Sequence, residues 1–89
     1  MAKILVTIKI FPKEAGGNLE ELKQQIQEAL PSDVSVHKFD EEPIAFGLVA
    51  VVAHIIMPEE KAGIVDIVEK AIRAISSVSE LQVAMVRRV

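Results

Sequence analysis

Few side chains in this 89-residue sequence could do chemistry by themselves. The two histidines, His37 and His54, lack the His-x-x-x-His spacing by which neighbouring imidazoles on a helix bind a metal ion. The absence of cysteine excludes thiol catalysis, disulfides and cysteine-type zinc sites. We expect His54, in the most apolar stretch, to be a hydrogen-bonded structural residue. His37 should face solvent.

Carboxylates gather at two places, where they could serve acid–base chemistry or bind a hard cation. Asp40, Glu41 and Glu42 are consecutive, and we expect them to form a solvated acidic turn. Glu59 and Glu60 follow Pro58 and are typical of the first turn of a helix, where negative charge is favourable. Neither group predicts a metal site.

The glycine-rich signatures of phosphate binding and acyl transfer are missing. Gly16-Gly17 is not followed by the Lys-Ser/Thr of a phosphate-binding loop, and neither G-x-G-x-x-G nor G-x-S-x-G occurs. We therefore predict a protein that is not an enzyme and has no catalytic centre, metal site or cofactor of its own.

Two segments remain as candidates for binding. In Pro43–Gly47 the aromatic Phe46 precedes Gly47, and this ring either fills the core beneath a turn or contacts a partner. The adjacent bases Arg87 and Arg88 end the chain before Val89. They form either a solubilising tail or a pair of guanidinium groups suited to carboxylates and phosphates.

The first half of the sequence predicts a strand and a helix. Alternation of β-branched residues over 4–11 predicts a strand that ends at Pro12. Asn18 is a good helix N-cap and Glu21 completes a capping box. The apolar stripe that follows predicts an amphipathic helix, which Pro31 ends. It comprises Leu19, Leu22, Ile26 and Leu30.

The second half predicts three strands and a helix. Residues 34–39 alternate and predict a strand, and the apolar run 48–56 predicts a central strand. A helix with its stripe over 64–75 should begin near Pro58, with Gly63 weakening its start. Residues 81–86 predict the last strand.

The order strand, helix, strand, strand, helix, strand is typical of the ferredoxin-like fold of the α+β class. Right-handed crossovers would place both helices on one face of a four-stranded antiparallel sheet. The other face would be open and partly apolar, with Leu5 and Phe11 or their neighbours on it. Such a face is a candidate partner surface.

Composition restricts the partners. Residues 1–89 are short enough for one domain, and the net charge of −3 with three aromatic residues does not fit a nucleic-acid-binding face. The apolar run Ile44–Ile56 is too short to cross a membrane. Without a signal-peptide pattern, we expect a soluble, cytoplasmic protein.

Four segments resemble the elongation factor 1-beta family in its short archaeal form. Lys3–Pro12 is similar to the family's first strand, and Asn18–Leu22 to the start of its first helix. His37–Leu48 matches the family's most distinctive stretch, and Val83–Val89 resembles its closing strand. The resemblance extends over essentially the whole chain.

The resemblance implies guanine-nucleotide exchange on the translation GTPase elongation factor 1-alpha. It implies that Phe46, before Gly47, docks on the GTPase and that Arg88 reaches the magnesium and phosphate region, with Arg87 sharing that role. The eukaryotic pattern has lysine at the position of Arg88, and basic residues where this chain has Val49 and Ala50.

Two other classes of protein share the expected fold. An acylphosphatase-like hydrolase needs an arginine and an asparagine around a phosphate loop, but the single asparagine, Asn18, is already explained as a helix cap. The alternative to exchange is a ferredoxin-like small-molecule-binding or oligomerisation module, since that fold alone does not define a function.

Overall fold

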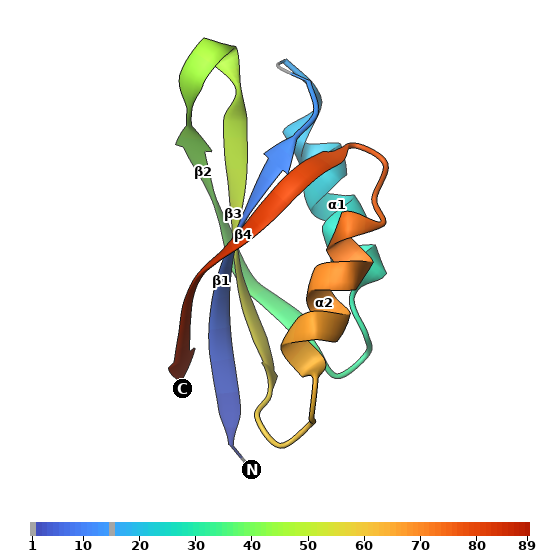
Figure 1. Cartoon of the computed structure of the whole chain (residues 1–89), viewed down its shortest axis with the longest axis vertical. Helices are drawn as coiled ribbons and strands as arrows, with labels where there is room; N and C mark the ends of the chain where they lie inside the picture. Colours follow the sequence, from blue (N-terminus) through green and yellow to red (C-terminus); the bar gives the residue numbers. More distant parts are fainter. Residues whose placement is uncertain (1, 15) are drawn as a thin grey trace.

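The chain alternates strands and helices in the predicted order βαββαβ. The computed structural model describes residues 2–14 and 16–89 (Figure 1). Its elements are β1 (Lys3–Pro12), α1 (Leu19–Ala29), β2 (Ser35–Pro43), the 3₁₀ turn Ala45–Gly47, β3 (Val49–Pro58), α2 (Ile64–Arg73) and β4 (Val78–Arg88).

The four strands form one antiparallel sheet in the order β2-β3-β1-β4. In the middle of β1, Ile8 lies opposite Ala53 of β3 and Val83 of β4. Both helices cover the same face of the sheet, and β2 and β4 form its two edges (Figure 1). The fold is therefore ferredoxin-like and of the α+β class, as the element order predicted.

The core lies between this face and the helices. Alternate side chains of the two central strands point into it and meet the apolar stripes of α1 and α2. Those that are completely buried are Val6, Ile8, Ile10, Ile26, Val51, Ala53, Ile55, Met57, Val68 and Ile72. Each fully buried Val, Ile or Met side chain contributes about 1.5–3 kcal/mol.

The first helix begins and ends as the sequence predicted. The N–H of Glu21 donates to Oδ1 of Asn18 over 3.1 Å, and the helix ends at Ala29 before Leu30 and Pro31. The two helices have 11 and 10 residues. In the part of the chain that the structure describes, no helix is long and apolar enough to cross a membrane.

The second helix begins later than predicted. Pro58 ends β3 opposite Lys3, and the helix starts only at Ile64, so Glu59 and Glu60 lie in the connection. Gly63 precedes the helix with a φ of 73°. Because few residues other than glycine adopt this left-handed conformation, Gly63 allows the turn into the helix rather than weakening it.

The acidic run is also placed differently from the prediction. Residues 40–42 belong to β2 and pair with β3, because β2 continues to Pro43. Two lysines compensate the charge: Lys9 of β1 contacts Glu42 at 3.0 Å, and Lys23 of α1 contacts Glu41 at 2.9 Å. The predicted solvated turn is therefore wrong, because neighbouring cations allow carboxylates within this edge strand.

Candidate functional site

The loop between β2 and β3 presents Phe46 to solvent. The loop is closed by two backbone hydrogen bonds, from the N–H of Ile44 to the carbonyl of Leu48 (2.8 Å) and from the N–H of Leu48 to the carbonyl of Ala45 (3.2 Å). Between them the Phe46 side chain is 95% exposed. The interpretation of Phe46 as part of the core is therefore wrong.

The backbone of Phe46 is as unusual as its exposure. Its φ of 60° and ψ of 34° are left-handed, and Gly47 follows with a φ of 75°. For a residue with a side chain this conformation is unfavourable by about 1–2 kcal/mol. A residue with an exposed ring and an unfavourable backbone conformation contributes little to folding, so Phe46 is a candidate for binding.

The two terminal arginines lie on opposite faces of the sheet. In β4, Arg87 is opposite Leu5 and Arg88 is opposite Ile4. Because Ile4 packs against the core between sheet and helices, Arg88 is on the helix side. Arg87 is on the open face. The strand alternation thus separates two bases that are adjacent in the sequence.

Arg88 is held by a carboxylate within the chain. Its Nη2 lies 2.7 Å and its Nε 2.8 Å from Oε1 of Glu59, just after β3. Backbone bonds hold the chain at Glu59 and next to Arg88: the N–H of Glu59 donates to the carbonyl of Ala2, and the N–H of Val89 donates to the carbonyl of Lys3, each over 3.1 Å. The ion pair therefore holds Arg88 at this end of the sheet in the free chain, while its side chain stays exposed.

The predicted site residues do not form one site. Phe46 and Gly47 lie in the loop just before the first residue of β3. Arg87 and Arg88 of β4 lie level with the last residues of β3, at the other end of the sheet (Figure 1). A strand of ten residues spans about 33 Å at about 3.3 Å per residue. The candidate site therefore consists of two separate contact points at opposite ends of the sheet.

A hydrogen-bonded row of polar side chains crosses the open face between these ends. The Nδ1 atom of His54, on β3, lies at a distance of 3.0 Å from Oγ1 of Thr7. Its Nε2 atom lies at a distance of 2.9 Å from Oδ2 of Asp40. This confirms the structural role expected for His54, and His37 is exposed as predicted. The contact with His54, with a smaller effect from Lys38, lowers the pKa of Asp40 below its ordinary value.

Comparison with known families decides the kind of protein. The family described as the EF-1 guanine nucleotide exchange domain matches residues 5–89. The match includes the candidate residues Phe46, Gly47, Arg87 and Arg88. The chain belongs to this family.

Archaeal relatives match this exchange domain along its whole length. Elongation factor 1-beta of Staphylothermus marinus is 42% identical over 89 residues, which is 100% of this chain and 99% of that protein. Elongation factor 1-beta of Methanothermobacter thermautotrophicus is 40% identical over 99% of this chain and 98% of its own length. That of Hyperthermus butylicus is 37% identical over 100% and 97%.

A solved structure supports the fold of the exchange domain. The C-terminal domain of the MgtC protein from Mycobacterium tuberculosis matches with a TM-score of 0.60, covering 99% of this chain and 88% of that chain. The sequence identity is 10%, so this likeness concerns the fold alone.

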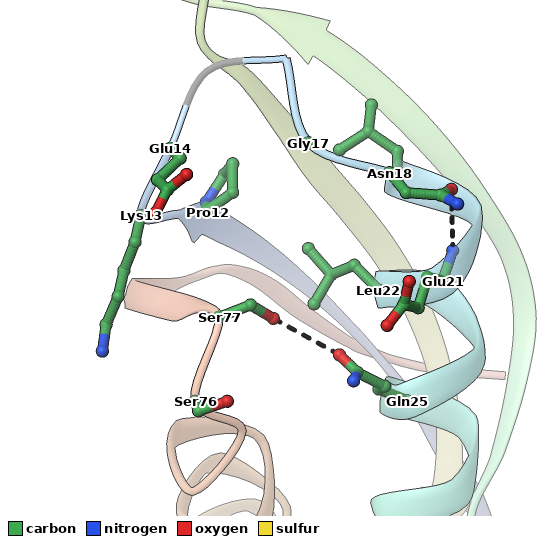
Figure 2. Close-up of a pocket in the computed structure, with 11 residues that line it drawn as sticks. Pro12, Lys13, Glu14, Gly17, Asn18, Glu21, Leu22, Gln25, Ser76 and Ser77 are labelled. Atoms are coloured by element: carbon green, nitrogen blue, oxygen red, sulfur yellow. Dashed lines mark hydrogen bonds between the residues drawn. The ribbon is translucent and has the colours of Figure 1, made fainter.

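The exchange domain also has a surface groove. It measures about 430 Å³ and lies between the loop after β1, the start of α1 and the turn before β4 (Figure 2). Some of its polar groups bond within the chain: Asn18 caps α1, and Oγ of Ser77 donates to Oε1 of Gln25 over 3.3 Å. None of the predicted site residues lines it.

Sequence reasoning missed one side chain of the exchange domain that contacts a predicted site residue. Glu59 was expected at the start of a helix, yet it binds Arg88, 29 residues further along the chain. No local pattern signals such a pair, because it depends on how the end of β3 and the end of β4 meet across β1.

Proposed function

We propose that residues 1–89 act as one domain that promotes the release of GDP from elongation factor 1-alpha. The family match and the whole-length archaeal relatives support this function. Exchange makes and breaks no covalent bond, so it does not require a catalytic group in this chain. A translation GTPase as partner would place the activity in the cytoplasm.

The observation that carries the proposal is the display of Phe46. A ring that is 95% exposed on a left-handed backbone is available to enter an apolar pocket of another protein without rearrangement. Gly47 allows the chain to turn directly behind the ring. We therefore assign docking on the GTPase to this loop.

The second contact is the guanidinium of Arg88. Nucleotide affinity in such GTPases depends on a magnesium ion that bridges the phosphates. A guanidinium brought to this region would oppose the metal ion by charge repulsion and occupy its surroundings. Nucleotide and exchange factor affect each other's affinity for the GTPase equally. A factor that binds the nucleotide-free GTPase more tightly than the nucleotide-bound form therefore weakens nucleotide binding by the same factor. Each tenfold change in affinity corresponds to about 1.4 kcal/mol.

The separation of Phe46 and Arg88 implies a division of labour. Two contact points about 30 Å apart are too distant to touch the same pocket, given the length of β3. Residues so far apart, which contact different regions of the GTPase, should act additively. We expect Phe46→Ala to weaken docking and Arg88→Ala to slow nucleotide release from the complex.

Release of labelled GDP from elongation factor 1-alpha, with and without this protein, tests the proposal. We expect substoichiometric protein to accelerate release, and Phe46→Ala and Arg88→Ala each to reduce the acceleration at least about tenfold. Ile67→Ala and Arg73→Ala are matched controls, because Ile67 is an exposed apolar residue and Arg73 an arginine paired with a glutamate, both on α2.

The possible outcomes test the exchange function, the role of Arg88 and the role of Phe46 separately. No acceleration by folded wild-type protein would contradict the exchange function. Acceleration that Arg88→Ala leaves unchanged would exclude the role given to Arg88 while leaving exchange intact. An unchanged dissociation constant for Phe46→Ala would exclude docking through the loop.

A further inference from the structure

Two positive side chains lie side by side at one end of the open face of the sheet. In β1, Ile4 packs against the core, so its neighbours Lys3 and Leu5 face the open side. Arg87 of β4 lies opposite Leu5 and is therefore the diagonal neighbour of Lys3 on the same face. Diagonal neighbours of an antiparallel pair lie about 7–8 Å apart. Lys3 and Arg87 together form a basic patch.

The basic patch lacks the carboxylates that neutralise the other lysines of the open face. Lys9 contacts Glu42 at 3.0 Å, and Lys38 contacts Asp40 at 3.7 Å. In the part of the chain that the structure describes, neither residue of the basic patch forms an ion pair. Neighbouring like charges do not stabilise a sheet. The basic patch is therefore a candidate for meeting an anion outside the chain.

Leu5 provides an apolar floor beneath the basic patch. Although Leu5 points to the open face, it is only 6% exposed. Its neighbours on the adjacent strands are Ile56 of β3 and Arg87 of β4. The aliphatic part of an arginine can cover such a residue while its guanidinium remains in water. This packing restricts Arg87, so less entropy is lost when the guanidinium meets an anion.

The basic patch lies at the end of the sheet that carries Arg88. The first residues of β1 and the last residues of β4 lie together at this end, opposite the turn Ala45–Gly47 (Figure 1). Arg88 is bound to Glu59 on the helix side, whereas the basic patch is on the open side and has no such partner among the described residues. Positive charge therefore borders both faces of this end.

Glu80 gives the other end of the open face the opposite charge. It lies opposite Phe11, and it too forms no ion pair within the described residues. Residues 80–87 of an extended strand span about 23 Å at about 3.3 Å per residue. A chain with a net charge of −3 is repelled from an anionic site as a whole. The unpaired charges of the open face allow it to approach such a site with the Arg88 end first.

We propose that the basic patch steers this end of the domain to the phosphates of the GDP bound to elongation factor 1-alpha. The inference rests on the exchange function proposed above. A bound nucleoside diphosphate carries more negative charge than one magnesium ion neutralises, so the occupied nucleotide site attracts cations. Complementary charge raises the rate of association more than the final affinity. The basic patch therefore acts during the encounter, before Arg88 leaves Glu59.

Stopped-flow association with GDP-bound elongation factor 1-alpha tests the steering. At low salt, Lys3→Gln and Arg87→Gln should each lower the association rate constant about threefold, and the double variant about tenfold. The dissociation rate constant should change little. The differences should disappear between about 0.01 M and about 1 M salt, because the Debye length falls from about 30 Å to about 3 Å.

Two further variants show whether the position of the charge matters. Lys70→Gln makes the same charge change on α2, where Lys70 pairs with Asp66, and should associate nearly as fast as the wild type. Ser35→Lys adds a cation to the open face opposite Ile56, at the same end as the basic patch, and should associate faster than the wild type. Circular dichroism of each variant establishes that the fold is intact.

The same rates measured with nucleotide-free elongation factor 1-alpha identify the anion. The effect of the basic patch should be smaller there, because the phosphates are gone. Equal effects on both forms would overturn the assignment to the phosphates. Unchanged rates for both glutamine variants, with a wild type that accelerates GDP release, would overturn the steering and leave the exchange function intact. A folded wild type that does not accelerate GDP release would overturn the exchange function and this inference with it.

Discussion

The guanidinium of Arg88 and the carboxylate of Glu59 form an ion pair with an Nη2–Oε1 distance of 2.7 Å. On our proposal Arg88 must leave this carboxylate to reach the nucleotide site of the GTPase. Replacing Glu59 with Gln keeps the shape of the side chain and removes the competing charge. Since exposed pairs contribute about 0.2–1 kcal/mol, we expect the complex with the GTPase to tighten by about 1.5- to 5-fold.

The binding constant of Glu59→Gln for nucleotide-free elongation factor 1-alpha, measured by titration calorimetry, checks this expectation. Glu69→Gln is the matched control, because Glu69 pairs with the unrelated Arg73 on α2. Weaker binding by Glu59→Gln would show that Glu59 supports the active position of Arg88 instead of competing for it.

The contact between His54 and Asp40 predicts how stability depends on pH. This contact lowers the pKa of Asp40 in the folded chain below the ordinary value of 3.8. The unfolded chain therefore binds the proton more readily. The stabilisation is complete above the unfolded pKa and is lost as the pH falls through the lowered, folded pKa.

Urea unfolding between about pH 6 and pH 2 measures this effect. Asp40→Asn should be less stable than the wild type at the upper end of the range, and the two proteins should converge as the pH falls. Asp66→Asn on α2 serves as a control for losing a carboxylate. A constant difference between Asp40→Asn and the wild type throughout this range would contradict the assignment.

Much of the fold could be predicted from local patterns, because each element has its own period and its own end signal. The alternation in β1, the cap at Asn18 and the stop at Pro31 describe strand and helix without knowledge of their neighbours. The start of α2 could not be predicted in this way. Pro58 is compatible with a helix start, but pairing with Lys3 keeps it in β3.

The candidate site was less predictable than the fold. An aromatic residue in a turn is equally compatible with a core position and with a display to solvent, and only the backbone course of 44–48 decides that Phe46 is exposed. Arg87 and Arg88 lie on opposite faces because β4 continues through both of them. Which of the two lies on the open face follows from the register of β4 on β1, which contains a shift that the sequence does not signal.

Gly63 provides a test of the corrected start of α2. A Cβ at this position would meet nothing within 4 Å, so Gly63→Ala should act through the left-handed backbone alone. We expect a loss of about 1 kcal/mol in the free energy of unfolding. Gly17→Ala is the control, because Gly17 has no such φ and its Cβ would meet only a backbone oxygen at 3.9 Å.

Urea denaturation of the two alanine variants shows whether Gly63 is needed for the left-handed turn before α2 or only weakens the start of that helix. Equal stability of Gly63→Ala and Gly17→Ala would show that the turn before α2 accommodates any residue. The original expectation, that Gly63 weakens the helix, predicts a gain in stability for Gly63→Ala.

Phe46→Asn should separate stability from function. Asparagine adopts the left-handed conformation more readily than phenylalanine, and an exposed ring has no core contacts to lose. We expect the free energy of unfolding to rise by about 0.5–1 kcal/mol. Docking on the GTPase should weaken, because the ring that enters its surface is gone.

The two properties should therefore move in opposite directions at this one position. Gly47→Ala is the complementary variant, because it retains the ring but adds a Cβ at a φ of 75°. It should destabilise the chain by about 1 kcal/mol. Chemical denaturation and the GDP-release assay, performed on the same preparations, measure both quantities. A drop in the stability of Phe46→Asn would mean that the ring packs against the chain, and a preserved exchange rate would mean that the loop does not dock.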